Sequence, residues 1–415
     1  MNALLKKVSD LPRDVAQYLV VTAGYWAFTL TDGALRMLVV LYFHGLGYSP
    51  LEVAMLFLLY EFFGVVTNLF GGWLAARVGL NVTMHIGLGL QVVALGMLLV
   101  SPSLLSVVYV MVAQALSGIA KDLNKMSAKS SIKMLLPDDD GAQSARLYRW
   151  VALLTGSKNS LKGIGFFLGA LLMSGLGFRG AVAVMAVGLL VVLMFSVALL
   201  DRQLGKTRFK PKFKDLFSKS AAINKLSAAR FFLFGARDVW FVVALPVFLQ
   251  AQLGWSHLSV GAMLAGWIIL YGLVQARAPA ITGISRGKIP DGGTALELAL
   301  LLCGLPALIA LAIWWQWQPQ WVIVFGLLAF GAVFALNSAV HSYLIVAYAK
   351  EDGVSLDVGF YYMANAAGRL AGTVLSGVVY QLWGLEVCLL VSSLMVGLAA
   401  VCSMGLPRAQ SSAAQ

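Results

Sequence analysis

The chain has 415 residues, of which 60% are hydrophobic and only 12% are charged. Soluble domains average roughly half apolar and about a quarter charged residues, so this composition excludes an ordinary soluble enzyme and predicts a membrane protein. The 30 Lys and Arg against 18 Asp and Glu indicate basic cytoplasmic loops rather than nucleic-acid binding. The cysteines lie in apolar runs and fit neither a disulfide framework nor a metal site; they are Cys303, Cys388 and Cys402.

Twelve apolar runs are long enough to cross a bilayer as helices, which predicts an all-α membrane protein. The charged first residues and the long run after them indicate that the first span is its own insertion signal. The expected spans are 17–43, 52–76, 82–100, 104–126, 147–173, 180–200, 226–250, 257–280, 293–314, 320–346, 357–380 and 385–406.

Several charged residues lie deep within these spans. A charge near the bilayer centre costs roughly 2.5–3.5 kcal/mol even on insertion scales, so these side chains are expected to face the protein interior. In chain order they are Asp32 and Arg36 in the first span, Glu61 in the second, Lys158 and Lys162 in the fifth, Arg237 and Asp238 in the seventh, and Arg369 in the eleventh.

The fourth span continues into a row of lysines at every fourth residue, with Asp122 beside the first of them; the row is Lys121, Lys125, Lys129 and Lys133. If the helix continues, these lysines form one slowly turning stripe. The first two are deep enough to line a cavity mouth and attract an anion, or to reach toward anionic lipid. The last two are expected at the lipid headgroups or beyond.

The segment 201–225 is the most cationic stretch and separates the sixth and seventh spans. By the positive-inside rule, this segment and both termini are expected on the cytoplasmic side of the membrane. The segment forms either an amphipathic helix lying on the membrane or a solvated basic linker. The loops opposite contain almost only Arg179, whereas the loops on its own side contain Arg77, Arg146, Arg149, Arg286 and Lys288.

Two copies of one unit flank this segment, at residues 1–200 and 226–415. The sequence GYSPLEVAML at 47–56 matches GWSHLSVGAML at 254–264. At an offset of 207 residues Lys162 matches Arg369 and Gly165 matches Gly372, and at an offset of 213 Asn124 matches Asn337. Two parallel six-helix halves are the architecture of major facilitator transporters.

Particular motifs add a resemblance to this pattern. GGWLAARVGLN at 71–81 resembles the loop signature of the major facilitator superfamily, except that Ala76 stands where the signature has an acid. Three longer segments resemble the organoarsenical efflux permeases of bacterial arsenic-resistance operons. This resemblance implies export of 1-arseno-3-phosphoglycerate, which a partner glyceraldehyde-3-phosphate dehydrogenase makes inside the cell. The segments are YWAFTLTDGALRMLVVL (25–41), SGIAKDLNKMSAKSSIK (117–133) and LTGSKNSLKGIGFFLGA (154–170).

Ion pairs explain only some of the deep charges. Asp32 and Arg36 are spaced as an i, i+4 pair on one helix, and Asp238 is available to Arg237 or Lys158. Cations are then left over, and a buried cation requires an anionic partner. This predicts a site for a multiply charged anion, against the alternative of salt bridges alone. The expected substrate-binding residues are Arg36, Lys121, Asn124, Lys125, Lys158, Lys162, Arg237, Asn337 and Arg369, and the candidate proton carriers are Asp32, Glu61 and Asp238.

The function that fits best is efflux of an organic oxyanion by alternating access, with no cofactor and no metal. The two asparagines in the predicted site have an alternative role in holding helices together. An organophosphate/phosphate exchanger or a proton-coupled drug pump is the alternative among transporters. A polytopic membrane enzyme is the alternative from another class, but the four histidines lie on different spans, which disfavours it; they are His44, His85, His257 and His341.

Overall fold

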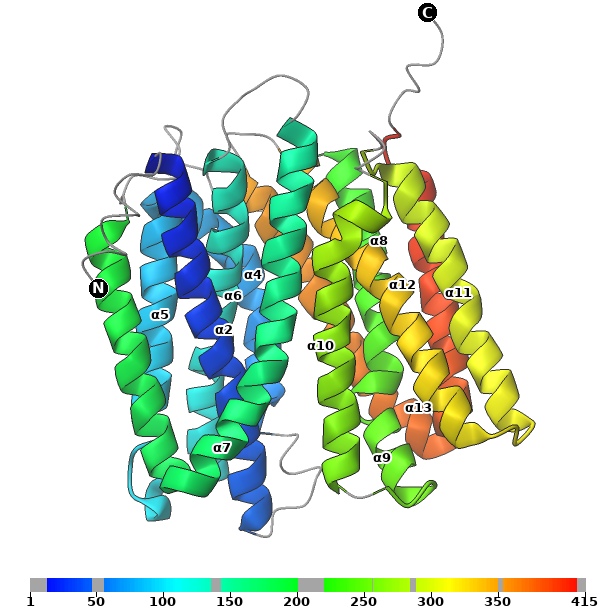
Figure 1. Ribbon diagram of the computed structural model, residues 1–415, viewed down its shortest axis with the longest axis horizontal. Coiled ribbons are helices and arrows are strands. Elements are labelled where there is room, and N and C mark those ends of the chain that lie inside the picture. Colours follow the sequence, from blue (N-terminus) through cyan, green and yellow to red (C-terminus); the bar gives the residue numbers. More distant parts are fainter. Residues whose placement is uncertain are drawn as a thin grey trace, which may run out of the picture. The chain divides into compact units, whose positions relative to one another are not determined.

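The computed structural model describes residues 13–46, 56–135, 143–200, 220–255, 257–283, 289–349 and 354–408. All regular structure in these segments is helical (Figure 1). The first part of the chain forms α2 (Arg13–Gly45), α4 (Leu58–Val78), α5 (Leu80–Met97), α6 (Val107–Leu135) and α7 (Gln143–Leu199). The second part forms α8 (Ala221–Phe241), α9 (Ala244–Ala251), α10 (His257–Ile281), α11 (Gly292–Trp314), α12 (Pro319–Tyr348) and α13 (Val354–Met404).

The two longest helices each contain two membrane spans. The backbone of α7 breaks at Gly177 (φ 67°, ψ 178°), and that of α13 breaks at Gly384 (φ 81°, ψ −175°). Glycine suits both positions because it has no Cβ to clash at positive φ. Since α8 and α9 together correspond to the seventh expected span, the described helices match all twelve spans. The prediction of an all-α chain with twelve spans is confirmed.

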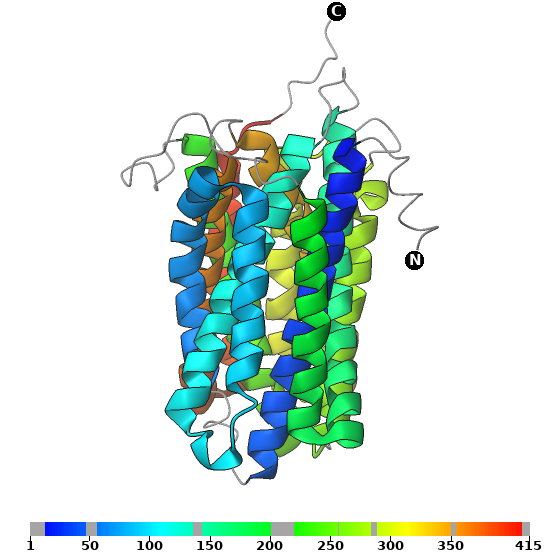
Figure 2. The same cartoon turned by 90° about the vertical axis from the view of Figure 1, so that its left-hand side faces the viewer.

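Helix α6 is longer and more buried than expected. It ends at Leu135 instead of near residue 126, and residues 122–132 are all buried. It packs against α2, α4 and α5, which run beside it (Figure 2). Eight helical segments of the described chain are long and apolar enough to cross a membrane by length and composition alone, and α2 and α6 are not among them. Helix α6, which has three buried charged residues, therefore depends on its neighbours to shield them from lipid.

The chain divides into two compact units. Unit 1 contains residues 1–143, 157–217 and 349–363, and unit 2 contains residues 144–156, 218–348 and 364–415. The first turns of α13 therefore belong to unit 1, where a methyl group added at Gly72 of α4 would overlap the Ser355 carbonyl oxygen. The predicted halves, 1–200 and 226–415, remain a prediction. Most of the predicted linker, 201–219, lies outside the described residues.

Glycines that match in the sequence repeat have matching roles in the two units. A Cβ built on Gly165 of α7 would lie 2.6 Å from the Leu30 carbonyl oxygen of α2. A Cβ on Gly372 of α13 would lie 2.5 Å from the Gly235 carbonyl oxygen of α8. Both distances are too short for any side chain, so glycine lets each helix pair approach at these points.

Candidate functional site

A buried carboxylate binds two of the stripe lysines in unit 1. Asp122 is 1% exposed, and its oxygens lie 2.5 Å from Lys125 Nζ and 3.7 Å from Lys121 Nζ. Each lysine also lies over an aromatic ring: Lys121 Nζ is 3.8 Å from the Tyr60 ring centroid and Lys125 Nζ is 4.3 Å from that of Tyr362. Carboxylate and ring faces both attract cations, and together they hold the lysines inside the unit.

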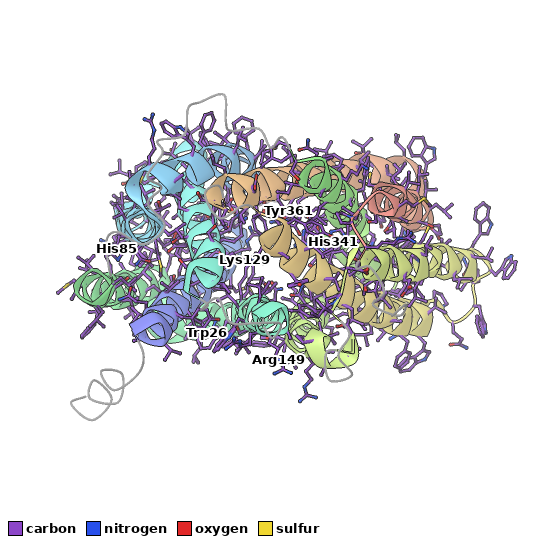
Figure 3. The ribbon with its side chains drawn as sticks, turned by 90° about the horizontal axis from the view of Figure 1, so that it is seen from above. Trp26, His85, Lys129, Arg149, His341 and Tyr361 are labelled. Carbon is purple, nitrogen blue, oxygen red and sulfur yellow. The ribbon has the colours of Figure 1, made fainter. Side chains whose placement is uncertain are left out.

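The third stripe lysine is also buried, which corrects the expectation for it. Lys129 is only 2% exposed, and its Nζ lies 5.2 Å from the Tyr362 ring centroid (Figure 3). The sequence placed it at the lipid headgroups because the apolar run seemed to end near residue 126. Helix α6 instead continues to Leu135 within the packed bundle. The side chain of Lys133 lies outside the described residues.

The charges of α2 and α4 pair differently from the expectation. Arg36 binds Glu61 of α4 at 3.3 Å and lies over the Tyr60 ring at 4.9 Å. Asp32 instead accepts a hydrogen bond of 2.8 Å from the Tyr60 hydroxyl. The expected Asp32–Arg36 ion pair is therefore wrong for the described structure, because a residue on the neighbouring helix competes for the arginine. Asp32 is a buried acid, and no cation of the described chain lies within ion-pair distance of it.

Lys158 and Lys162 lie in unit 1 on the first arm of α7, and both are half-buried. The backbone at Lys162 lies against α2, because a Cβ on Gly33 would be 2.7 Å from the Lys162 carbonyl oxygen. Their predicted partner in the other half, Arg369, lies in unit 2. Their assignment to the substrate site remains a prediction.

In unit 2 one carboxylate binds two arginines. Asp238 is fully buried, and its Oδ1 lies 2.5 Å from the Arg237 guanidinium. Its Oδ2 accepts a hydrogen bond of 3.1 Å from Arg369 Nε, which joins α8 to α13. Arg369 therefore has an acidic partner in Asp238, which the sequence did not predict, and its assignment to the substrate site remains a prediction. A carboxylate has two oxygens and can bind two guanidinium groups at once.

The two asparagines matched by the repeat have different environments. Asn124 donates to the Ala120 carbonyl oxygen of its own helix at 2.8 Å, and its amide fills the space beside Gly87 of α5. The contact with Gly87 joins α6 to α5 and is typical of a residue that holds helices together. Asn337 of α12 is fully buried, and within the described chain neither atom of its amide has a hydrogen-bond partner.

Arg230 of α8 escaped the sequence prediction. It is 3% exposed and donates to the carbonyl and hydroxyl oxygens of Ser338 on α12 at 3.2 and 3.0 Å. One feature of the sequence indicates that Arg230 faces the interior. It precedes Arg237 by two helical turns and therefore lies on the same helix face. The seventh span is expected to begin at residue 226, so the sequence does not show whether Arg230 lies at the end of the span or in the interior.

The comparisons with known proteins agree with this architecture. The family model described as Major Facilitator Superfamily matches residues 21–293. No curated protein sequence gives a significant match.

Solved structures resemble the chain along nearly its whole length. The human organic anion transporter MFSD10 (TETRAN) has a TM-score of 0.74 at 17% identity, covering 95% of this chain and 100% of its own. The fucose:proton symporter FucP of E. coli has a TM-score of 0.70 at 12% identity, covering 94% and 98%. A bacterial homologue of the iron transporter ferroportin has a TM-score of 0.68 at 13% identity, covering 93% and 98%. With the family model matching well over half of its length, the chain belongs to the major facilitator superfamily and is a membrane transporter rather than an enzyme.

Proposed function

We propose that this transporter exports an organic oxyanion from the cytoplasm, and that its cargo is 1-arseno-3-phosphoglycerate. A partner glyceraldehyde-3-phosphate dehydrogenase would supply this compound from arsenate, so that export confers arsenate resistance. The transporter would lie in the bacterial inner membrane with both termini in the cytoplasm and work by alternating access. The resemblance of three long segments to organoarsenical permeases supports the choice of cargo.

The observation that carries the anionic cargo is a row of three lysines on one face of α6, of which Lys125 and Lys129 are buried and Lys121 is partly buried. Lys121, Lys125 and Lys129 are held inside unit 1 by Asp122 and two tyrosine rings rather than extending into solvent. Burying cations is expensive, and an apolar drug would gain nothing from them. A phosphate or arsenate group would gain charge-assisted hydrogen bonds from every one. The fold that this chain shares with a human organic anion transporter is compatible with such a cargo.

The contacts of Asp32 support proton coupling of the export. An ion-paired acid must break its pair to bind a proton, whereas Asp32 is held by the Tyr60 hydroxyl. Protonation of Asp32 would therefore leave no cation unpaired. We assign proton exchange to Asp32 rather than to Glu61 or Asp238, which both bind arginines.

Arsenate resistance in cells tests the cargo directly. An arsenic-sensitive bacterium that expresses the transporter together with the dehydrogenase should grow in arsenate, and neither protein alone should protect it. Lys125→Met should abolish this protection because it removes a buried cation from the stripe. Lys225→Met is the matched control, since Lys225 is an exposed lysine at the start of α8. Protection against arsenite without the dehydrogenase would refute the assigned cargo.

A further inference from the structure

A second polar cluster lies inside unit 2, where α8, α10 and α12 meet. It consists of five residues, none more than 5% exposed: Arg230, Tyr271, Asn337, Ser338 and His341. The rings of Phe234 and Phe334 pack together beside it with centroids 5.1 Å apart. Burying polar groups among aromatic rings costs free energy, so packing alone does not explain why these residues lie here.

The hydrogen bonds within the cluster leave one hydroxyl proton unused. Ser338 Oγ accepts from Arg230 at 3.0 Å and from the Tyr271 hydroxyl at 3.0 Å. A hydroxyl group has one proton to donate and can accept twice. The Ser338 proton therefore has no acceptor within the described chain. If the serine donates to the tyrosine instead, the tyrosine proton is left over, so one donor remains in either arrangement.

Two neighbouring residues on α12 add further unused groups. Asn337 and His341 are four residues apart and share a helix face next to Ser338. Within the described chain, neither the amide of Asn337 nor either ring nitrogen of His341 has a hydrogen-bond partner. Each buried polar group without a hydrogen-bond partner destabilises the folded protein. Native proteins retain few such groups, and a bound ligand is one reason to keep them.

The chemistry of the cluster selects an anion. Arg230 carries a permanent positive charge, and Ser338 or Tyr271, Asn337 and His341 each offer a proton donor. The cluster contains no acid, and Asp238, farther along α8, already binds two arginines. A cationic ligand would be repelled by Arg230, and a neutral sugar would make little use of its charge.

We propose that this cluster binds an oxyanion group of the transported molecule, either its phosphate-type or its carboxylate-type end. The inference rests on the proposed function, because it assigns one end of that anionic cargo to named residues of unit 2. In this structure the cluster is closed to solvent, so the group would enter in a conformation in which α12 moves away from α8 or α10.

Binding of 3-phosphoglycerate to the full-length protein in detergent tests the proposal. Ser338→Ala and Arg230→Lys should each weaken the affinity by about tenfold, because each removes or misplaces a donor to a charged group. Ser392→Ala is the matched control, because Ser392 is also fully buried with an unpartnered hydroxyl but lies on α13, outside the cluster. The control should bind as the wild type does.

Two simpler probes identify which end is bound. If inorganic phosphate competes with 3-phosphoglycerate, and Ser338→Ala weakens that competition, the cluster binds the phosphate end. If glycerate competes instead, and Ser338→Ala weakens that competition, the cluster binds the carboxylate end. Wild-type affinity in Ser338→Ala and Arg230→Lys, with or without a lowered Tm, would overturn the proposal and leave the cluster as a structural network.

The binding results also separate this inference from the proposed cargo. Weakened 3-phosphoglycerate binding in the variants would support the cluster even if cells gained no arsenate resistance. Full arsenate resistance together with unchanged binding in Ser338→Ala and Arg230→Lys would refute the cluster and leave the cargo intact.

Discussion

The three candidate proton carriers differ in the groups that surround them. Asp238 holds two arginines, and Glu61 holds Arg36 at 3.3 Å. Asp32 accepts a hydrogen bond from Tyr60. An acid bound to guanidinium groups contributes mainly to structure, because removing its charge leaves partly buried arginines without their counter-charge. An acid held by a hydroxyl can gain and lose a proton while its neighbours stay in place. We therefore assign proton exchange to Asp32 and structural roles to Glu61 and Asp238.

Asp32→Asn should abolish transport against a gradient while leaving folding unchanged. The amide keeps the shape of the carboxyl group, and its oxygen still accepts from Tyr60, but it cannot exchange a proton. The measurement is uptake of a non-hydrolysable phosphoglycerate analogue into everted vesicles under an imposed pH gradient, with exchange and Tm measured in parallel. Glu297→Gln, which neutralises an exposed acid of α11, is the control. Normal gradient-driven uptake by Asp32→Asn would remove Asp32 from the coupling mechanism.

Asp238→Asn should have the opposite outcome. It leaves Arg237 and Arg369 without their shared carboxylate in the interior of unit 2, a change that typically destabilises a protein by about 3–5 kcal/mol. We expect a lower yield of folded protein and a lower Tm in detergent, and the loss should be larger than for Asp32→Asn. Equal thermal stability of the two variants would contradict the structural role assigned to Asp238.

At the level of helices, the charged elements are positioned by close backbone contacts. Gly33 and Gly165 bring α2 and α7 together, and Gly235 and Gly372 do the same for α8 and α13. These contacts place Asp32 and Lys162 on one helix pair, and Asp238 and Arg369 on the other. Without a hydrophobic driving force between helices in lipid, such packing supplies much of the association. The glycines therefore fix where the charges lie.

Gly33→Ala should destabilise unit 1. The new methyl group would lie 2.7 Å from the Lys162 carbonyl oxygen and 3.3 Å from Gly165 Cα, and overpacking of this kind costs about 1–3 kcal/mol. Thermal unfolding in detergent is the measurement. Gly188→Ala, on the second arm of α7, is the matched control because its methyl group would meet nothing within 4 Å. Since alanine favours helix more than glycine, the control should keep or raise the Tm, and a similar loss in both variants would contradict the argument.

For the molecule as a whole, the sequence predicts the fold well and the pairing of charges poorly. Length and hydropathy locate the twelve spans because a bilayer imposes its thickness on every helix. Which charges meet depends on how helices rotate and slide against each other. In the structure Arg36 therefore pairs with Glu61 and not with Asp32, and Asp238 of α8 binds Arg369 of α13. The burial of Arg230 depends on how α8 and α12 pack together, which the sequence does not show.

The charge distribution predicts the membrane orientation of the whole chain, and reporter fusions can test this prediction. The basic segment 201–225 should stay in the cytoplasm, since positively charged loops resist translocation. Gly177 and Gly384, where α7 and α13 break, should then lie on the periplasmic side, and the C-terminus on the cytoplasmic side. Alkaline phosphatase, which becomes active only after export, should be active when fused after Gly177 or Gly384 and inactive when fused after Gln415. Green fluorescent protein at the C-terminus should fluoresce. An active phosphatase after Gln415 would mean that the C-terminus lies outside the cytoplasm. The predicted orientation or the number of spans would then be wrong, and so would the direction of transport that we assign.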